Sequence, residues 1–538
     1  MLTAPVRIDG DLAVIEFSDF SLANYPLFLK VKQLPESRLE FEWETDTYRI
    51  TTPARFVDRL GVDPAPPDRT PGELAPHLFD YQRWAVRLAL TAKRFALWLN
   101  TGLGKTACYL EWARQVTAMT GGRVLILAPL AVIPQTIAMA REFYGEATPI
   151  YQLQTREELI AWCVSGGDGI KIAMCNYEKL NAGEIPEFRH PAGIVADESS
   201  MLKTGGGVRK WNLIHSSKGI PYKLSCTATP APNDAMEYAS QAAFLETIRT
   251  EGEVFWTFFS KDKYGNWSVK PHAKAAFYRF LSSWSLYLHD PVHFGFADIL
   301  SSLPDPVVQE ERLGLTDDQR RLMQTILVSH GGDMFGETLG VVPRQKLAQL
   351  ARGFLYPGKE GGEMERVVSA KPHRVAAIIE REVLAGRQVL IWSTFDAEGG
   401  VIREALNGRP VNAAAVAELT GKQTDVQRLA ILDRFRAGEI RCLISKPQLI
   451  GYGLNLQFVR AMVFSGFDDS FERAYQAIRR AYRFGQTEPV RVYWPYIPEL
   501  EGVVFDNIRA KEARFLADVE AQEQAYRAAF AESGELAA

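Results

Sequence analysis

A lysine and a threonine follow two closely spaced glycines in residues 100–106, NTGLGKT, between the apolar run 95–99 and a stretch of helical character. Small residues let backbone N–H groups wrap a pyrophosphate, and the N-terminal end of the following helix adds positive charge. Lys105 would reach the β- and γ-phosphates, and the Thr106 hydroxyl would hold Mg²⁺. The pattern GxxxxGK[ST] requires glycine where this chain has Leu99, so an ordinary glycine turn is the alternative. The loop residues expected around the phosphates are Thr101, Gly102, Leu103 and Gly104.

Two adjacent carboxylates end another apolar run, in residues 193–200, GIVADESS. A strand that ends in this pair places Asp197 at the edge of a sheet, where it can bind Mg²⁺ through water. Glu198 can then orient and deprotonate the attacking water. An Asp-Glu pair after a strand is commonly only a solvated turn, but here a phosphate-loop pattern lies upstream at the end of another expected strand. Together the two segments indicate nucleotide hydrolysis.

Cysteine and histidine usage excludes several kinds of site. The chain of 538 residues has five scattered cysteines and no CxxC pair, which excludes a zinc ribbon and a disulfide framework and fits a reducing cytosol. The eight histidines form no HExxH or HxxxH group, so a metal ion, if used, must come with a substrate. No apolar run approaches the ~18 residues of a membrane span, and the N-terminus lacks a secretory pattern. We therefore expect a cytoplasmic protein.

The charge is nearly balanced overall but unevenly distributed. The formal net charge is −4, so the whole molecule is not a general electrostatic binder of nucleic acid. Residues 1–76 hold 8 Lys/Arg and 13 Asp/Glu. Any phosphate-binding surface must therefore be a local groove outside this N-terminal segment.

The first half of the chain divides into two segments of different character. Residues 1–70 are expected to form a small β-rich domain, because apolar residues alternate with glutamates in 39–44. A proline-rich linker follows and ends at Pro76. Residues 77–245 then alternate apolar runs with helical stretches, which is typical of a parallel sheet covered on both faces. The apolar runs are 95–99, 124–128, 170–175 and 193–197.

A second set of apolar runs begins after about residue 366 and comprises 388–393, 440–445, 461–466 and 490–494. The sequence therefore predicts an α/β fold with two parallel-sheet lobes, at 77–245 and 366–500. Residues 246–365 are expected to form a helical, aromatic and basic insertion that also connects the lobes. Residues 501–538, rich in Ala and Glu, are expected to form a C-terminal helix that packs on the second lobe.

Ordered motifs along residues 79–495 resemble those of superfamily 2 helicases. TGLGKT (101–106), DESS (197–200) and TATP (227–230) resemble motifs I, II and III. YQAIRRAYRFGQ (475–486) resembles the QAxxRAxRxGQ block of the Swi/Snf-like branch. Shorter matches are FDYQ (79–82), APL through Gln135, NYE (176–178), LTGK with QR (419–428) and GYGLNL (451–456). The resemblance implies two tandem RecA-like lobes, and the compact ending is most similar to phage-encoded helicase-like proteins, which implies a bacterial or phage-infected cell.

The resemblance implies a nucleotide site shared between the lobes. Gln82 would read the adenine edge, and Arg480 and Arg483 would cross the cleft as arginine fingers that neutralise charge on the transferring phosphoryl. Because each lobe carries half of the site, hydrolysis would be fast only when the lobes close. The implied catalytic residues are Lys105, Asp197, Glu198, Arg480 and Arg483, with Thr106 and Asp197 as metal ligands and Gly453 among the nucleotide contacts. The implied coupling residues, which sense the γ-phosphate, are Thr227, Thr229 and Gln476.

A solvated basic helix face is the alternative for the three arginines of this block, and the resemblance assigns no role to Arg479. The nucleic-acid backbone would be contacted from both lobes, through positions that do not read bases. Affinity should then be salt-dependent and largely independent of sequence. The implied contacts are Pro129, Gln135, Tyr177, Lys422 and Asn455.

The middle region combines cations with aromatic rings. Residues 256–290 hold five Lys/Arg and two Asp/Glu among tryptophans, tyrosines and phenylalanines. Such rings could stack on bases or brace a duplex, and Lys270 and Lys274 are candidate contacts. The alternative is that the aromatic residues form the core of a helical insertion.

The sequence thus predicts an ATP- and Mg²⁺-dependent translocase or helicase acting on DNA, with double-stranded DNA preferred. An RNA-dependent ATPase is one alternative, and a non-catalytic nucleic-acid-binding scaffold is another, which the intact hydrolytic residues argue against. No membrane partner is expected. The acidic N-terminal domain is either a module for a protein partner or plain structural packing, and repair and recombination are among the processes left open.

Overall fold

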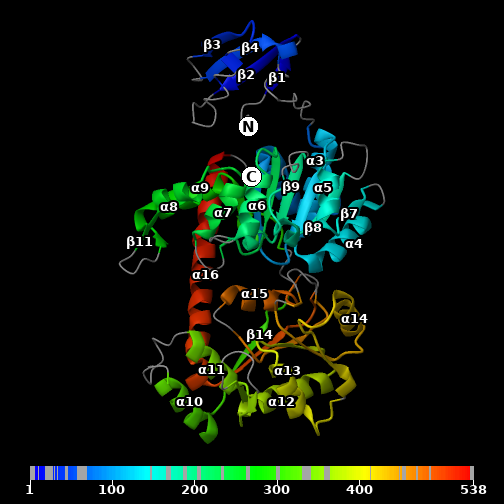
Figure 1. Cartoon of the computed structure of the whole chain (residues 1–538), viewed down its shortest axis with the longest axis vertical. Helices are drawn as coiled ribbons and strands as arrows, with labels where there is room; N and C mark the ends of the chain where they lie inside the picture. Colours follow the sequence, from blue (N-terminus) through cyan, green and yellow to red (C-terminus); the bar gives the residue numbers. More distant parts are fainter. Residues whose placement is uncertain are drawn as a thin grey trace.

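The N-terminal sheet is a small unit with its own core. The computed structural model of the 538-residue chain describes residues 6–9, 11–17, 28, 31–32, 34–42, 47–56, 70–145, 148–164, 171–185, 191–202, 207–231, 235–261, 267–298, 303–329, 341–356, 364–411, 413–447, 449–450, 456–467, 470–483 and 486–533. Strands β1 (Val6–Asp9), β2 (Leu12–Phe17), β3 (Arg38–Glu42) and β4 (Thr47–Pro53) pair antiparallel in the order β1-β2-β4-β3. Ile15 and Ile50 face each other across this sheet and are fully buried. The predicted β-rich N-terminal domain is confirmed by this sheet (Figure 1).

The first lobe is a seven-stranded parallel sheet in the order β13-β5-β10-β9-β6-β8-β7. Its central strands β10, β9 and β6 are buried along their whole length because helices cover both faces. The strands are β5 (Arg94–Leu99), β6 (Val124–Ala128), β7 (Ile150–Gln152), β8 (Ile172–Asn176), β9 (Gly193–Asp197), β10 (Tyr222–Cys226) and β13 (Ser285–Leu288). The helices are α2 (Asp80–Ala92), α3 (Lys105–Thr120), α4 (Ile133–Tyr144), α5 (Arg156–Val164), α6 (Val208–Ser216) and α7 (Glu237–Phe244).

The middle region adds a strand to each lobe. After α8 (Glu251–Phe258), the hairpin β11 (Phe259–Lys261) and β12 (Trp267–Val269), and α9 (Lys274–Ser282), the chain enters β13 beside β5 of the first sheet. It then forms β14 (Val307–Arg312), which pairs with β21 of the second sheet. The remaining elements are α10 (Asp317–Ser329), α11 (Val341–Ala351), β15 (Phe354–Leu355) and β16 (Glu365–Arg366). The region is therefore part of both lobes as well as a helical insertion.

The second lobe is a six-stranded parallel sheet in the order β14-β21-β20-β17-β19-β18. Two parallel sheets in tandem confirm the predicted fold class. The strands are β17 (Val389–Trp392), β18 (Val416–Glu418), β19 (Cys442–Ser445), β20 (Ala461–Phe464) and β21 (Arg491–Tyr496). The helices are α12 (Ala370–Leu384), α13 (Glu398–Leu406), α14 (Asp425–Arg436) and α15 (Phe471–Arg479).

The last helix, α16 (Pro498–Ser533), runs beside both lobes (Figure 1). Near its start, Phe505 packs in the core of the second lobe. Near its end, Tyr526 and Phe530 pack in the core of the first lobe. The predicted packing on the second lobe therefore holds for only the first half of the helix. The second half packs on the first lobe, because buried apolar residues continue as far as Phe530.

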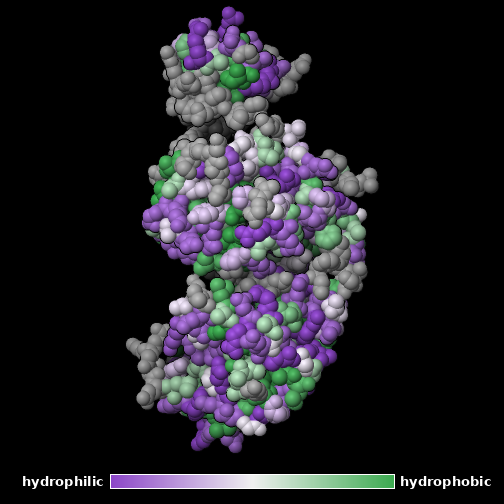
Figure 2. All heavy atoms as spheres, turned by 90° about the vertical axis from the view of Figure 1, so that its right-hand side faces the viewer, coloured by the Kyte–Doolittle hydropathy of each residue, from purple (hydrophilic) through white to green (hydrophobic). Residues whose placement is uncertain are grey.

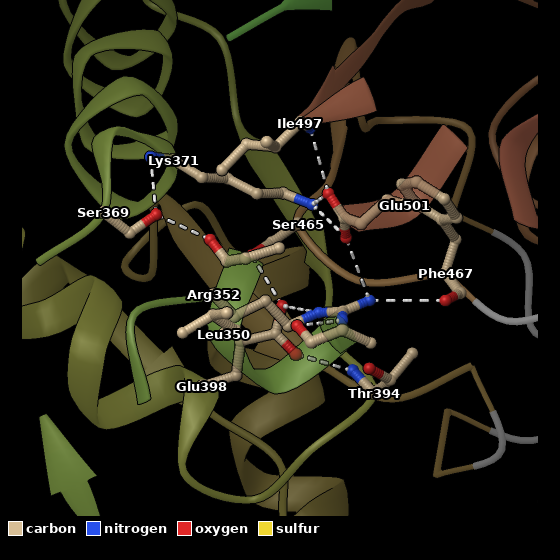
Figure 3. A network of polar contacts seen from close by, with 12 residues as sticks. Leu350, Arg352, Ser369, Lys371, Thr394, Glu398, Ser465, Phe467, Ile497 and Glu501 are labelled. Carbon is tan, nitrogen blue, oxygen red and sulfur yellow. Dashed lines mark hydrogen bonds and ion pairs between the residues drawn. The ribbon is translucent and has the colours of Figure 1, made fainter. Parts of the chain in front are cut away.

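A buried polar network fixes the start of α16 in the second lobe (Figure 3). The ammonium group of Lys371 donates to both carboxylate oxygens of Glu501 at 2.7 Å. Arg352 lies 3.4 Å from Glu398 and 3.6 Å from Glu501. All four side chains are at most 2% exposed. Burial lowers the pKa of Lys371 to about 8 against the opposing effect of Glu501. The charges of two cations and two anions thus offset each other inside the protein.

On the face drawn in Figure 2, hydrophilic and hydrophobic residues are interspersed over both lobes. Within the residues that the structure describes, no helix has the length and apolar character needed to cross a membrane.

Candidate active site

The glycine loop joins the carboxyl end of β5 to the first residue of α3. Gly102 and Gly104 have φ angles of 94° and 72°, which side-chain-bearing residues rarely adopt. A Cβ atom on Gly104 would also clash with the side-chain amide of Gln82. Lys105 lies over the loop and donates to the carbonyl of Leu99 at 2.9 Å. Leu99 itself is fully buried in β5, so the position where the pattern asks for glycine belongs to the sheet rather than to the loop.

Gln82 ties helix α2 to this loop. Its Oε1 accepts a hydrogen bond from the backbone N–H of Phe79 at 3.0 Å, and its Nε2 donates to the carbonyl of Leu103 at 3.0 Å. The hydroxyl of Tyr81 donates to the same carbonyl at 3.0 Å. In this conformation the Gln82 amide therefore holds the shape of the loop, at the wall of the cavity where adenine contact is predicted.

The two predicted carboxylates follow β9 directly. Asp197 is 7% exposed and ends the strand, and Glu198 has a φ of 52°, which turns the chain sharply after it. Tyr109 donates to Asp197 Oδ2 at 3.3 Å, and the backbone N–H of Glu198 donates to Oδ1 at 3.0 Å. Tyr177 donates to the Asp197 carbonyl at 2.6 Å. Two tyrosines thus fix the end of the strand and with it the direction of the carboxylate.

Burial dominates the electrostatics of these groups. It raises the pKa of Asp197 to about 7, with the neighbouring Glu198 charge adding to the rise and Lys105 opposing it. Burial also lowers the pKa of Lys105, against the opposing effect of Glu198 and then Asp197. Because charged forms are costly in a buried site, the cluster favours a ligand that completes its charge balance.

A cavity of about 300 Å³ lies over the loop and the carboxylates. Its lining includes Lys105, Thr106 and the two carboxylates, together with the rings of His77, Phe79 and Phe143. The predicted nucleotide residues on its wall are Gln82, Thr101, Gly102, Gly104, Lys105, Thr106, Asp197, Glu198 and Arg483. A cavity lined by cationic and hydroxyl groups and by aromatic rings suits a nucleotide.

Both predicted arginine fingers face the loop from the second lobe. A smaller cavity is lined by Thr101 and Glu198 of the first lobe and by Gln476, Arg480 and Arg483 of the second. Arg480 caps the end of α15 and is 4% exposed. Burial lowers the pKa of Arg483, against the opposing effect of the Glu198 charge. The structure therefore has the lobes close enough to share one site.

A chain of polar contacts links Glu198 to α15, which we call the arginine helix because Arg480 and Arg483 follow at its end. The Thr227 hydroxyl lies 3.5 Å from Glu198 Oε2 and accepts a hydrogen bond from the N–H of Thr229 at 3.2 Å. Gln476 Nε2 donates across the cleft to the Thr229 hydroxyl at 3.2 Å. The structure thus brings the three predicted coupling residues into one connected path.

Comparison with known families decides what this arrangement is. A model of the DEAD/DEAH box helicase family matches residues 79–237, and a model of the helicase conserved C-terminal domain matches residues 370–485. Together the matches cover just over half of the chain and include the loop, both carboxylates and both arginines. The chain belongs to the superfamily 2 helicases. Within this superfamily, the motif at residues 475–486 predicts the Swi/Snf-like branch.

Three curated proteins are similar to the helicase. The chromatin remodeling factor mit1 of Schizosaccharomyces pombe is 21% identical over 329 residues, which are 56% of this chain and 22% of that protein. The chromodomain-helicase-DNA-binding protein 1-like of Danio rerio is 22% identical over 437 residues, 78% of this chain and 41% of its own length. Protein p41 of Acyrthosiphon pisum secondary endosymbiont phage 1 is 24% identical over 414 residues, 70% of this chain and 82% of p41. The helicase thus spans less than half of the two eukaryotic proteins.

Two solved structures are also similar to the helicase. The Sulfolobus solfataricus SWI2/SNF2 ATPase core in complex with dsDNA has 19% identity and a TM-score of 0.39, over 82% of this chain and 96% of that one. The core domain of the same ATPase by itself has 18% identity and a TM-score of 0.38, over 80% and 87% of the two chains.

Three of the predicted nucleic-acid contacts of the helicase lie away from its open surface. Tyr177 is fully buried and its hydroxyl is bound to the Asp197 carbonyl, so it offers no surface to nucleic acid in this conformation. Pro129 is buried where β6 ends. Gln135, on α4, lines the 300 Å³ cavity beside the glycine loop. Burial inside the lobe, which motif position alone does not reveal, corrects the Tyr177 prediction.

The other predicted contacts are more accessible. Lys422 is exposed in the turn before α14. Lys270 donates to the carbonyls of Trp256 and Thr257 at 2.9 and 3.1 Å and so caps the end of α8. Lys274 is half exposed and lies 3.5 Å from Asp518 of α16. Gly453 and Asn455 lie outside the described residues.

Sequence reasoning missed several residues that the structure brings to the site. His77 and Phe143 line the cavity, and their rings stack at 4.2 Å between centroids. Tyr109 holds Asp197 from the second turn of α3. Asn100, at the end of β5, bonds to the loop and to the second lobe. The only available signal was proximity in sequence to a motif, which does not indicate a direction for the side chain.

Proposed function

We propose that this helicase hydrolyses Mg²⁺–ATP and uses the cycle to translocate along double-stranded DNA. The observation that carries the proposal is the shared cavity of Glu198, Arg480 and Arg483, which joins the two lobes at the glycine loop. A nucleotide held there contacts both halves of the molecule at once. Nucleotide state then controls how the halves are arranged.

In this proposal the first lobe holds and activates the substrate. The backbone N–H groups of the glycine loop and the start of α3 bind the phosphates, and Lys105 leaves the Leu99 carbonyl to pair with them. Glu198 accepts the proton of the attacking water. The rings that line the cavity, with Phe79 beside Gln82, accommodate the base.

The donor set suits Mg²⁺ brought in with ATP. Thr106 and Asp197 offer hydroxyl and carboxylate oxygens, which are the ligands that this hard cation prefers. Burial beside Glu198 raises the pKa of Asp197 to about 7, so the pair is short of positive charge. A divalent cation supplies that charge and neutralises the phosphates.

The second lobe contributes the charge that speeds hydrolysis. Arg480 and Arg483 stabilise the negative charge that develops on the transferring phosphoryl, an effect of roughly 10³–10⁵ in rate in other NTPases. Their approach depends on lobe closure. Polar contacts connect Glu198 through Thr227 and Thr229 to Gln476 on the arginine helix. Through these contacts, loss of the γ-phosphate changes the position of the helix.

The choice of DNA is supported by two of the relatives, whose names describe a chromatin remodeling factor and a helicase-DNA-binding protein. The uneven charge of the chain favours local contacts to phosphates rather than a broad basic surface. Contacts of this kind follow the backbone and do not read sequence.

The test measures ATP hydrolysis alone and with matched double-stranded DNA, single-stranded DNA and duplex RNA. Stimulation by double-stranded DNA, lost in Lys105→Ala and Glu198→Gln, is the expected result. If only RNA stimulates hydrolysis, RNA replaces DNA as the proposed substrate. If the two variants are as active as the wild type, the proposed site is overturned. A triplex-displacement assay beside a strand-displacement assay separates translocation from unwinding, since only translocation is needed to displace a third strand.

A further inference from the structure

A direct hydrogen bond joins the arginine helix to the start of the glycine loop. The hydroxyl of Tyr475, on α15 of the second lobe, lies 2.8 Å from Asn100 Oδ1 at the end of β5 in the first lobe. Asn100 is 5% exposed, so the bond forms in a largely desolvated place. Neither residue has a role in the sequence motifs described above.

The partners of Asn100 fix the direction of this bond. Its Oδ1 also accepts from the backbone N–H of Thr101 at 2.8 Å, and its Nδ2 donates to the carbonyl of His289 at 3.3 Å. Because a backbone N–H only donates and a carbonyl only accepts, the amide has one orientation that satisfies both. Tyr475 must therefore donate. One oxygen atom thus accepts a hydrogen bond from the first residue of the loop and another from the opposite lobe.

Tyr475 is held firmly from the side of the second lobe. The guanidinium group of Arg479 lies over its ring at 5.1 Å and over the ring of Tyr482 at 4.8 Å. The rings of Phe471 and Phe515 pack at 5.6 and 5.4 Å from that of Tyr475. Burial raises the pKa of the Tyr475 phenol, so it stays a neutral donor. Arg479, which the sequence left without a role, stiffens this part of the helix.

We infer that Tyr475 is a positioning residue for ATP hydrolysis, which sets how closely the arginine helix seats against the glycine loop. The residue directly after it is Gln476, and Arg480 and Arg483 follow on the same segment, so fixing Tyr475 fixes the reach of both guanidinium groups. The inference rests on the proposed ATPase function and deepens it. The ring of Tyr475 packs against residues of α15 and α16, whereas its hydroxyl reaches the first lobe and sets the register of α15 with the loop.

The first experiment compares Tyr475→Phe with Tyr482→Phe in steady-state ATP hydrolysis with saturating DNA. Both variants keep a ring against Arg479, but only the Tyr475 hydroxyl reaches the first lobe, since that of Tyr482 bonds Asp305 at 3.2 Å. Loss of one net hydrogen bond from the closed state is expected to lower kcat about two- to tenfold with KM for ATP unchanged. Tyr482→Phe is expected to match the wild type. Equal kcat in Tyr475→Phe and the wild type overturns the inference.

A double-mutant cycle with Asn100→Ala tests the pair itself. If the two groups act together, Tyr475→Phe causes no further loss of kcat in the Asn100→Ala background. Independent, multiplying losses would contradict the pairing.

A readout without hydrolysis separates the inference from the proposed function. All five native cysteines are buried, so cysteines placed at the exposed Tyr151 of the first lobe and Leu429 of the second can be labelled selectively for energy transfer. Closure is titrated with Mg²⁺ and a non-hydrolysable ATP analogue. Tyr475→Phe is expected to lower the closed fraction at saturating analogue about two- to tenfold, with the midpoint of the titration unchanged. An unchanged closed fraction overturns the inference, whereas absence of ATPase activity in the wild type overturns only the proposed function.

Discussion

Arg483 of the second lobe and Glu198 of the first line the same small cavity, and the Glu198 charge opposes the burial-induced fall in the pKa of Arg483. The two side chains come from positions 285 residues apart in the sequence. Their proximity means that the second lobe reaches Glu198 in this conformation. Predictions about activity follow from this geometry.

Removing either arginine should slow hydrolysis without weakening nucleotide binding. Arg480→Ala and Arg483→Ala are each expected to lower DNA-stimulated kcat by about 10³. KM for ATP should change little, because the loop and Lys105 bind the ground state. Arg436→Ala, on the exposed face of α14, is the control, since Arg436 pairs with Asp433 at 2.8 Å, away from the cavity. A rise in KM with unchanged kcat would contradict the assigned role.

Binding of Mg²⁺–ADP should depend on pH near neutrality. Burial and the Glu198 charge raise the pKa of Asp197 to about 7. Below that pH the carboxyl group is protonated and cannot serve as a ligand, so affinity is expected to fall as the pH drops from 8 to 6, approaching tenfold per unit. Titration with a fluorescent ADP derivative at several pH values measures the effect.

Two variants identify the group that titrates. Glu198→Gln removes one of the two causes of the raised pKa, so the midpoint should move to lower pH. Asp197→Asn should abolish the pH dependence together with most of the affinity for Mg²⁺. A midpoint that stays in place in both variants would assign the effect to another group.

The buried network at the start of α16 should matter for the stability of the second lobe. Glu501→Ala leaves Lys371 buried without its carboxylate partner, and breaking such a pair costs about 3–5 kcal/mol of unfolding free energy. Urea denaturation followed by circular dichroism measures the shift. The matched control is Glu439→Ala, whose pair with Arg434 at 3.0 Å is more than half exposed and is expected to contribute under about 1 kcal/mol. Equal shifts in the two variants would show that the buried network adds nothing.

The far end of α16 is predicted to be anchored by one carboxylate. Glu523 accepts hydrogen bonds from the backbone N–H groups of His289 and Asp290 at 2.6 and 3.1 Å, and it lies 2.7 Å from the His293 ring. Glu523→Ala should speed amide hydrogen exchange across the end of the helix by about ten- to a hundredfold, as expected for loss of ~1.5–3 kcal/mol. Glu520→Ala, on the exposed face, should leave exchange unchanged. Identical exchange in both variants would remove Glu523 as the anchor.

The sequence predicted the central strands well because their apolar runs are short, continuous and bounded by polar loops. Residues 124–128 and 193–197 form β6 and β9 with the expected bounds. It did not place β13 or β14, because each joins its sheet beside a strand more than 180 residues away, and that pairing leaves no local pattern. Similarly, periodicity predicted a helix after residue 500 but not that Tyr526 and Phe530 would pack on the first lobe.

The same limit applied to the site. Motif spacing indicated Lys105, Asp197 and Glu198, whose local loops and strand ends determine where they lie. It assigned Tyr177 to nucleic acid, whereas the fold turns this residue inward to support β9. The bond between Tyr475 and Asn100 depends on how two lobes meet, which neither segment specifies by itself.

Helix α16 limits how the two lobes can move relative to each other. At about 1.5 Å per residue, a continuous helix of 36 residues is a rod of roughly 54 Å. Such a rod bends gently but does not lengthen, and each of its ends is embedded in a different half of the molecule. Pulling the halves apart along the rod would tear one end out of its core, while swivelling them around it preserves both. The relative movement of the lobes that costs the least free energy is therefore a rotation about the helix axis rather than a separation along it.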